Sequence, residues 1–178
     1  YYVGRSMYET DGIPPHWREN VERHVREVWV PSAFNVRSFA RQGVPEGALR
    51  QLPEALDPLV FDPAATEPLP LEGREGFMFL SVFKWERRKG WEVLLRAFWE
   101  EFSRADNVTL YLRSTMDAGN KDELHRLRAE FLRERGKSES DLPPVRLLAE
   151  PLPLVDLPAL YRAADAFVLP SHGEGWGR

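Results

Sequence analysis

The sequence FMFLSVFKWERRKGWEVLLRAFWEEFSR, residues 77–104, decides the fold. Its first seven residues, Phe77–Phe83, form an apolar run with the length of a buried strand. From Lys89 to Arg104 the apolar residues recur at helical spacing and share one face, at Trp91, Leu94, Leu95, Phe98 and Phe102. The stretch therefore predicts a buried strand, a basic loop and an amphipathic helix, in that order.

The same order of elements repeats toward the C-terminus. Apolar runs predict strands at Val108–Leu112, Val145–Leu148 and Ala166–Leu169, and helical patterns fill Lys121–Arg135 and Pro158–Ala164. Apolar strands that alternate with helices are typical of a parallel sheet covered on both faces. We predict an α/β fold with a Rossmann-like parallel sheet in residues 77–178.

The part of the chain before Phe77 has a different character. Residues 1–60 predict a short helical and extended section, in which Pro14 and Pro15 can begin one helix and Ser32 can cap another. Residues 61–76 are rich in proline, glutamate and glycine, a composition that predicts a linker.

Composition narrows the class of protein. The 178 residues are 43% hydrophobic and 29% charged, as in a soluble globular protein, and the net charge of −4 gives no reason to expect nucleic acid as a partner. The absence of cysteine excludes disulfides, thiolate zinc sites and cysteine nucleophiles, and fits a cytoplasmic protein. The chain begins at Tyr1 and ends at Arg178 inside a loop, so we expect it to be truncated at both ends.

The loops that follow the predicted strands are where chemistry is expected, because ligands bind at the carboxyl ends of strands in an open parallel sheet. The first loop holds four cations, Lys84, Arg87, Arg88 and Lys89, directly before a helix. Since a helix N-terminus also favours anions, this loop predicts a diphosphate site; the alternative is a solvated charged turn. No GxGxxG pattern is present, so a dinucleotide fingerprint is not supported.

The last loop reads PSHGEGWG from Pro170, and its glycines, Gly173 and Gly175, permit close approach of a ligand to the main chain. Glu174 between them can accept hydrogen bonds from sugar hydroxyls, or it is a solvated residue of a flexible turn. Ser171 and His172 are further candidates for sugar binding in this loop. Ser114 and Thr115 in the second loop, Arg113–Gly119, and Glu150 in the third loop, Ala149–Leu154, are possible parts of the same site. A lone histidine is more often a surface residue, and the Ser114–Thr115 loop can be a plain turn.

The tryptophans near the first loop have two possible roles. Trp85, Trp91 and Trp99 either stack on a ligand or pack on the helix, and packing is favoured for Trp91 and Trp99.

Several stretches resemble glycosyltransferase group 1 (family 4). FLSVFKWERRKGWEVLLRAF, from Phe79, is similar to the segment G-R-x-x-x-x-K-G-x-x-x-L-x-x-A-F of that family, and LPALYRAADAFVLPSHGEGWGR, from Leu157, to L-Y-x-x-A-D-x-x-V-x-P-S-x-x-E-G-x-G. Residues 27–63 resemble the crossover that leaves the N-terminal domain. GRSMYETDGIPPHW, from Gly4, resembles an N-terminal-domain stretch in which Met7, Glu9, Thr10 and Asp11 have no assigned role.

The resemblance implies a GT-B fold: an incomplete donor-binding C-terminal domain at 77–178, the end of the N-terminal acceptor domain at 1–60, and a linker at 61–76. It implies retaining, hexosyltransferase-like transfer from a UDP-, GDP- or ADP-linked sugar without metal or cofactor. Lys84, which stands in place of an arginine of the family, and Lys89 would hold the diphosphate. Glu174 matches the first of two paired glutamates, and the second lies beyond the chain. No catalytic base is assigned, and the fragment alone is expected to be inactive.

The acceptor is not specified, and any peripheral membrane contact is expected only through the N-terminal domain. Three other interpretations stay open at this point. The first is a nucleotide-sugar epimerase of the same fold, the second a non-catalytic nucleotide- or sugar-binding module, and the third a structural α/β domain. A glutamate eight positions after Glu174 would favour the transferase.

Overall fold

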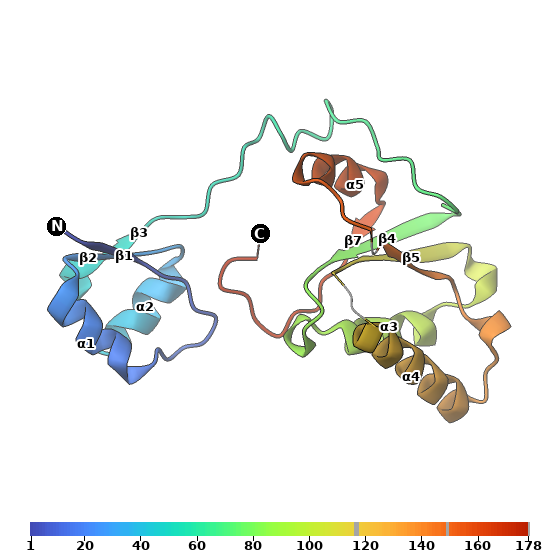
Figure 1. The fold of residues 1–178 in the computed structure, drawn as a ribbon, viewed down its shortest axis with the longest axis horizontal. Coiled ribbons are helices and arrows are strands. Elements are labelled where there is room, and N and C mark those ends of the chain that lie inside the picture. The colour runs from blue at the N-terminus through green and yellow to red at the C-terminus, as the bar shows by residue number, and fades with distance from the viewer. Residues whose placement is uncertain (116–117, 149, 178) are drawn as a thin grey trace. The chain divides into compact units, whose positions relative to one another are not determined.

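The computed structural model describes residues 1–115, 118–148 and 150–177, and the chain divides into two compact units. The first unit comprises Tyr1–Leu56 together with the residues from Gly173 on. The second unit comprises Asp57–His172. The helices and strands of both units are labelled in Figure 1. Of the predicted loops, Met116, Asp117, Ala149 and Arg178 lie outside the described residues.

The first unit is built on a parallel sheet in the order β1-β2-β3, with two helices. Its elements are β1 (Val3–Arg5), α1 (Pro15–His24), β2 (Glu27–Val30), α2 (Ala33–Arg41) and β3 (Leu49–Gln51). A 3-10 turn, Glu46–Ala48, precedes β3. The buried core consists of Ile13, Val28, Val30, Phe39, Val44 and Leu49.

Both predicted helix starts in this unit are confirmed. Pro15 is the first residue of α1, where a proline loses no intrahelical hydrogen bond. Ser32 caps α2, because its Oγ accepts a hydrogen bond from the main-chain amide of Asn35 at 3.2 Å.

The second unit is a four-stranded parallel sheet in the order β6-β5-β4-β7. Its strands are β4 (Phe77–Val82), β5 (Val108–Arg113), β6 (Val145–Leu148) and β7 (Ala166–Phe167), and its helices are α3 (Trp91–Glu101), α4 (Ala118–Arg135) and α5 (Leu157–Ala163). Shorter 3-10 turns lie at Arg87–Lys89, Arg104–Asp106, Glu139–Asp141 and Leu154–Asp156. The predicted strand–helix alternation is thereby confirmed.

Helices cover both faces of this sheet, as the unbroken apolar strands predict (Figure 1). On β4, Phe79 packs with α3 and α4 on one face, whereas Met78 and Leu80 pack with α5 on the other. This division follows from the two-residue period of strand side chains. In the described ranges, no helix is both long and apolar enough to cross a membrane.

Part of the proline-rich segment is packed against the sheet. Leu69 and Leu71 join the cluster under α5, and the Leu69 amide donates to the Ala159 carbonyl at 2.9 Å. The Tyr111 hydroxyl donates to the Glu72 carbonyl at 3.0 Å. Residues 69–72 are therefore fastened to the second unit, and we refer to them as the strap.

Candidate functional site

The loops after β4 and β7 are joined at the carboxyl edge of the second sheet. β7 pairs with β4 in parallel, so both strands end at this edge. The main-chain amide of His172 donates to the Arg88 carbonyl at 2.8 Å, and the Ser171 Oγ donates to the same oxygen at 3.2 Å. The His172 side chain is exposed. The structure thus brings two predicted site residues onto the basic loop.

The basic loop is an exposed cluster of charges. The Lys84 side chain is 77% exposed, and its Nζ lies 2.8 Å from a carboxylate oxygen of Glu86. Arg88 contacts the other oxygen of Glu86 at 3.5 Å. The hydrogen bond from Lys84, followed by the charges of Lys84, Arg88 and Lys89, lowers the pKa of the Glu86 carboxyl. Since Glu86 stays ionised at neutral pH and is outnumbered by cations, the loop keeps a positive potential.

Gly90 turns the basic loop into helix α3. Its φ of 71° lies in the left-handed region, and it occupies the N-cap position of α3 without a side chain to cap the first turn. A Cβ at Gly90 would lie 2.1 Å from the Pro170 carbonyl oxygen, so only glycine fits. A helix N-terminus favours anions, and that of α3 directly follows the cations of the loop.

A cavity of about 190 Å³ opens beside this loop, at the ends of β4 and β5. It is lined by Val82, Phe83, Arg113, Ser114, Thr115, Leu152, Pro153, Leu154 and Leu157. Ser114 is 2% exposed, and its Oγ has no hydrogen-bond partner among the described residues. The cavity therefore offers an apolar wall and a buried hydroxyl group.

Of the three residues in the predicted second and third loops, two share this cavity. Ser114 and Thr115 line it, whereas Glu150 lines a neighbouring cavity of about 200 Å³. Arg113 borders both cavities, and its Nη1 donates to the Leu148 carbonyl at 3.2 Å. Sequence reasoning overlooked the apolar wall formed by residues 152–154, although the PLPL pattern after β6 could have indicated it.

The glycine-containing segment from Gly173 on belongs to the first unit. A Cβ placed on Gly173 would lie 3.4 Å from Glu9 Cβ, and one placed on Gly175 would lie 3.2 Å from Met7 Cγ. Glu174, between these glycines, is partly buried. The predicted sugar-binding segment therefore lies against the loop that follows β1.

The tryptophans near the basic loop are packing residues. Trp85, Trp91 and Trp99 are 9%, 2% and 1% exposed. The rings of Trp85 and Trp91 stack with centroids 4.3 Å apart, and the Trp85 indole N–H donates to Glu123 Oε2 at 2.9 Å. The packing interpretation is confirmed for Trp91 and Trp99, and it extends to Trp85.

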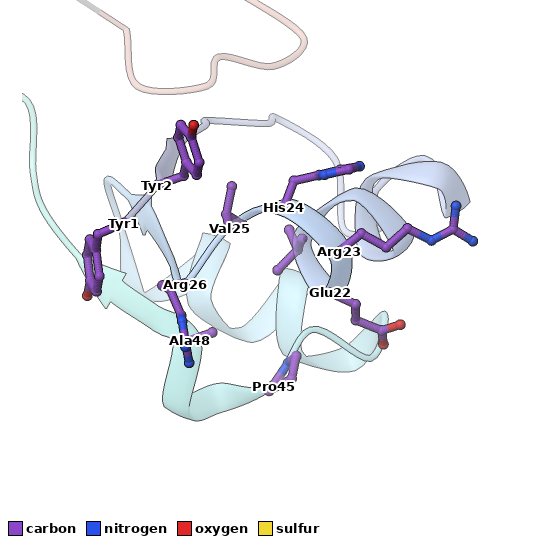
Figure 2. Close-up of a pocket in the computed structure, with 10 residues that line it drawn as sticks. Tyr1, Tyr2, Glu22, Arg23, His24, Val25, Arg26, Pro45 and Ala48 are labelled. Carbon is purple, nitrogen blue, oxygen red and sulfur yellow. The ribbon is translucent and has the colours of Figure 1, made fainter.

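The first unit holds a larger hollow of about 530 Å³, shown in Figure 2. Tyr2, which precedes β1, and Arg26, which precedes β2, both line it. It therefore lies at the amino ends of the strands, whereas ligands of parallel sheets bind at the carboxyl ends.

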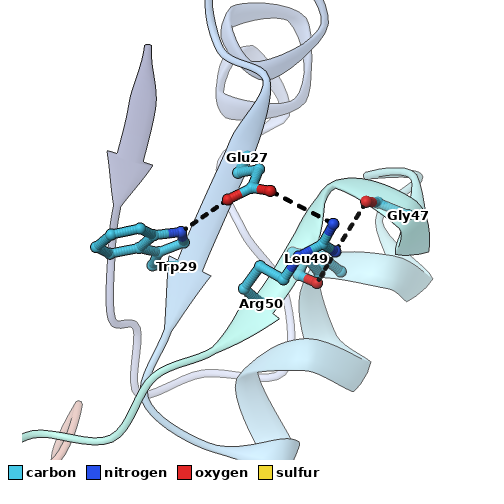
Figure 3. A network of polar contacts seen from close by, with 5 residues as sticks. All are labelled: Glu27, Trp29, Gly47, Leu49 and Arg50. Atoms are coloured by element: carbon cyan, nitrogen blue, oxygen red, sulfur yellow. Dashed lines mark hydrogen bonds and ion pairs between the residues drawn. The ribbon is translucent and has the colours of Figure 1, made fainter. Parts of the chain in front are cut away.

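A polar network on the same sheet fastens β2 to β3 (Figure 3). The Trp29 indole N–H donates to Glu27 at 3.1 Å and thereby lowers the pKa of that carboxyl. Arg50 lies 3.4 Å from the other oxygen of Glu27 and donates to the carbonyls of Gly47 and Leu49 at 2.9 Å. Since each of its charged groups is engaged locally, we assign this network a structural role.

Comparison with solved structures identifies the fold. Over 95% of its length the chain superposes on HepE from Anabaena, crystallised with UDP and glucose, with a TM-score of 0.65 and 16% identity. The α,α-trehalose-phosphate synthase (UDP-forming) from Burkholderia vietnamiensis matches 92% of the chain with a TM-score of 0.62 and 17% identity. The catalytic domain of starch synthase IV from Arabidopsis thaliana, bound to ADP and acarbose, matches 86% with a TM-score of 0.51 and 14% identity. The chain has part of a GT-B fold.

The predicted fold class is thereby confirmed. The chain spans 46%, 43% and 36% of these three structures, so it corresponds to less than half of each. No protein-family model matches the sequence, and no curated protein matches it. At such low identity the likeness establishes the GT-B architecture alone.

Proposed function

We propose that this chain supplies the donor-binding part of a glycosyltransferase that moves a hexose from a nucleoside-diphosphate sugar to an acceptor with retention of configuration. The observation that carries the proposal is the exposed cationic loop in front of α3, at the carboxyl edge of a parallel sheet within a GT-B fold. UDP-bound structures of the same fold, such as HepE, support a nucleotide sugar as the ligand.

The residues take separate roles in this proposal. Lys84 and Lys89, with the first-turn amides of α3, bind the diphosphate and stabilise the charge that develops on it as the sugar leaves. These groups do the work that a metal ion does elsewhere, so we propose a metal-independent reaction. Ser114 and Thr115 contact the nucleoside in the cavity beside the loop.

The glycine-containing segment binds the transferred sugar. Glu174 accepts hydrogen bonds from sugar hydroxyls, and the main chain at Gly173 and Gly175 allows the sugar to approach closely. Ser171 and His172 anchor the start of the segment through the Arg88 carbonyl.

The test is a calorimetric titration of UDP, GDP and ADP into the chain and into a Lys84→Ala/Lys89→Ala variant. One nucleotide is expected to bind, and the variant is expected to bind it at least 100-fold more weakly. That figure follows because two charge-assisted contacts at about 1.5 kcal/mol each amount to about 3 kcal/mol. The matched control, Arg104→Ala/Arg133→Ala, removes two exposed cations from the opposite edge of the sheet and should bind normally.

Two results would contradict the proposal. Nucleotide binding that survives the double lysine substitution would refute the diphosphate site. Nucleotide binding by the complete gene product without transfer of sugar to any acceptor or to water would indicate a binding module instead.

A further inference from the structure

Glu86 lies in the middle of the basic loop, and its main chain is held in place there. It precedes the 3-10 turn Arg87–Lys89 as the N-cap residue, and its carbonyl oxygen accepts a 2.9 Å hydrogen bond from the Lys89 amide. On the other side of it, Trp85 is buried and its indole N–H donates to Glu123 of α4. The Glu86 carboxylate is therefore kept close to the cations of the loop.

This carboxylate is shared between two cations. Its Oε1 lies 2.8 Å from Lys84 Nζ, and its Oε2 lies 3.5 Å from Nη2 of Arg88. The Glu86 side chain makes no capping hydrogen bond to its own 3-10 turn, so its oxygens serve the cations. Lys84 is one of the residues to which the proposed function assigns the diphosphate. Glu86 thus neutralises part of the charge that a diphosphate would meet.

An oxygen of a diphosphate bound to Lys84 would lie close to Glu86. An ammonium group has three N–H donors in a tetrahedral arrangement, and Glu86 takes one of them. Two oxygens bound to one ammonium at about 2.8 Å each lie about 4.6 Å apart. For like charges about 4 Å apart in water, repulsion weakens binding about fivefold for each unit of charge. Glu86 therefore weakens the binding of an anion to Lys84 in proportion to the charge of that anion.

A nucleotide sugar and the nucleotide that remains after transfer differ in this charge. In a nucleoside-diphosphate sugar both phosphates are esterified, so the diphosphate carries a charge of about −2. In the free nucleoside diphosphate the terminal phosphate ionises a second time with a pKa of about 6, so the charge is about −3 above neutral pH. The additional charge lies on the phosphate that the sugar has left.

We propose that Glu86 is a specificity-determining residue, which favours the nucleotide sugar over the free nucleoside diphosphate by repelling the additional charge of the terminal phosphate. The inference rests on the proposed function, since it concerns the same diphosphate site. It explains why an acidic residue stands among the four cations of a loop that binds an anion. Because the carboxylate weakens binding of the product more than binding of the donor, the spent nucleotide is exchanged more readily for a new donor.

Calorimetry on the complete gene product tests the role of the charge without a sugar. It compares the nucleoside diphosphate that binds, UDP, GDP or ADP, with the methyl ester of the same nucleotide at its terminal phosphate, which lacks the additional charge. At low salt, Glu86→Gln is expected to strengthen binding of the free nucleotide about two- to fivefold more than binding of the ester. This difference should shrink in about 1 M salt, where charges are screened within about 3 Å. Glu101→Gln, which alters an exposed carboxylate at the far end of α3, is the matched control and should change neither affinity.

The outcomes distinguish this inference from the function on which it rests. If no nucleotide binds to the wild-type protein, the proposed function fails and the inference with it. If the nucleotide binds but Glu86→Gln weakens binding of both ligands, the carboxylate orients Lys84 for the diphosphate, so the inference is wrong and the proposed function stands. Unchanged affinities, or an equal gain for the free nucleotide and its ester, would also overturn the inference alone.

Discussion

The main-chain amide of His172 donates a 2.8 Å hydrogen bond to the carbonyl oxygen of Arg88. These residues are far apart in sequence, one after β7 and one before α3, and the bond joins the two loops at the carboxyl edge of the sheet. It also explains why Gly90, two residues after Arg88, has the Pro170 carbonyl directly against it. The conformation of the basic loop therefore depends on the loop that follows β7.

The first prediction concerns Gly90→Ala. The left-handed φ of 71° costs a non-glycine residue about 1–2 kcal/mol, and the added Cβ would meet the Pro170 oxygen at 2.1 Å. We expect the substitution to lower the free energy of unfolding by more than the backbone term alone and to weaken nucleotide binding. Urea denaturation and calorimetry measure the two effects.

Gly136→Ala is the matched control for this prediction. Gly136 has a φ of 62°, yet no atom of the residues that the structure describes lies within 4 Å of the position of its Cβ. It should show the backbone cost without the collision and without any change in nucleotide affinity. Equal destabilisation by the two substitutions would mean that the contact between Pro170 and Gly90 is unimportant.

The second prediction is that Trp85 stabilises the protein and does not stack on the nucleotide. Trp85→Phe removes the 2.9 Å hydrogen bond to Glu123 and part of the stacking on Trp91, so a loss of about 0.5–3 kcal/mol of stability is expected. The Kd for the nucleotide should stay within about twofold of the wild-type value. A variant with unchanged thermal stability and lost binding would show the opposite assignment to be correct.

The third prediction concerns the N-cap of α2. Ser32→Ala removes the acceptor for the Asn35 amide and the donor to its side chain, and should cost about 1 kcal/mol. Because Asn35 also holds the Tyr8 carbonyl, hydrogen exchange should quicken in the loop after β1. Ser32→Asp, which keeps a capping oxygen, should retain most of the stability; equal loss in both variants would refute the capping role.

The sequence predicts the second sheet well because its strands are buried on both faces. The largely apolar strands β4 and β5 are hidden from water when helices cover both faces of a parallel sheet. The first and last residues of the helices and strands depend on local contacts, which the apolar pattern does not specify. α3 begins at Trp91 and not at Lys89, because Gly90 adopts a left-handed conformation. β7 ends at Phe167, two residues before the predicted Leu169.

Features set by long-range contacts could not be predicted. β1 and β3 are three residues long and largely polar, so they carry no strand pattern and form only because β2 lies between them. The composition of the strap is that of a linker. Its position is set by the packing of Leu69 and Leu71 under α5, which the sequence does not reveal. At the candidate site, the charges and glycines are visible in the sequence. The approach of Glu9 to Gly173 depends on the fold.

The fourth prediction tests the strap. Tyr111 is 1% exposed, burial raises the pKa of its hydroxyl group, and that hydroxyl donates to the Glu72 carbonyl. Tyr111→Phe should cost about 1 kcal/mol and speed exchange of the Leu69 amide, which is bonded to Ala159. Tyr161→Phe, a half-buried tyrosine in the same cluster, should have a smaller effect on that amide. Unchanged exchange in Tyr111→Phe would show that the hydrogen bond does not fasten the strap.

The fifth prediction is a pH dependence that originates at Asp106. Hydrogen bonds from the hydroxyl and the main-chain amide of Ser103, each 2.7 Å long, lower the pKa of the Asp106 carboxyl below its ordinary 3.8. The ionised form is therefore favoured by folding, so its contribution to stability is present above pH 3.8 and is lost as the pH falls through the lower pKa of the folded state.

Asp106→Asn should be less stable than the wild type at neutral pH, and the difference in stability should shrink at pH 3 and below. Urea denaturation of both proteins from pH 7 to pH 2.5 measures this difference, in which the other acidic groups cancel. A difference that stays constant over the whole range would exclude the charge of Asp106 as its source.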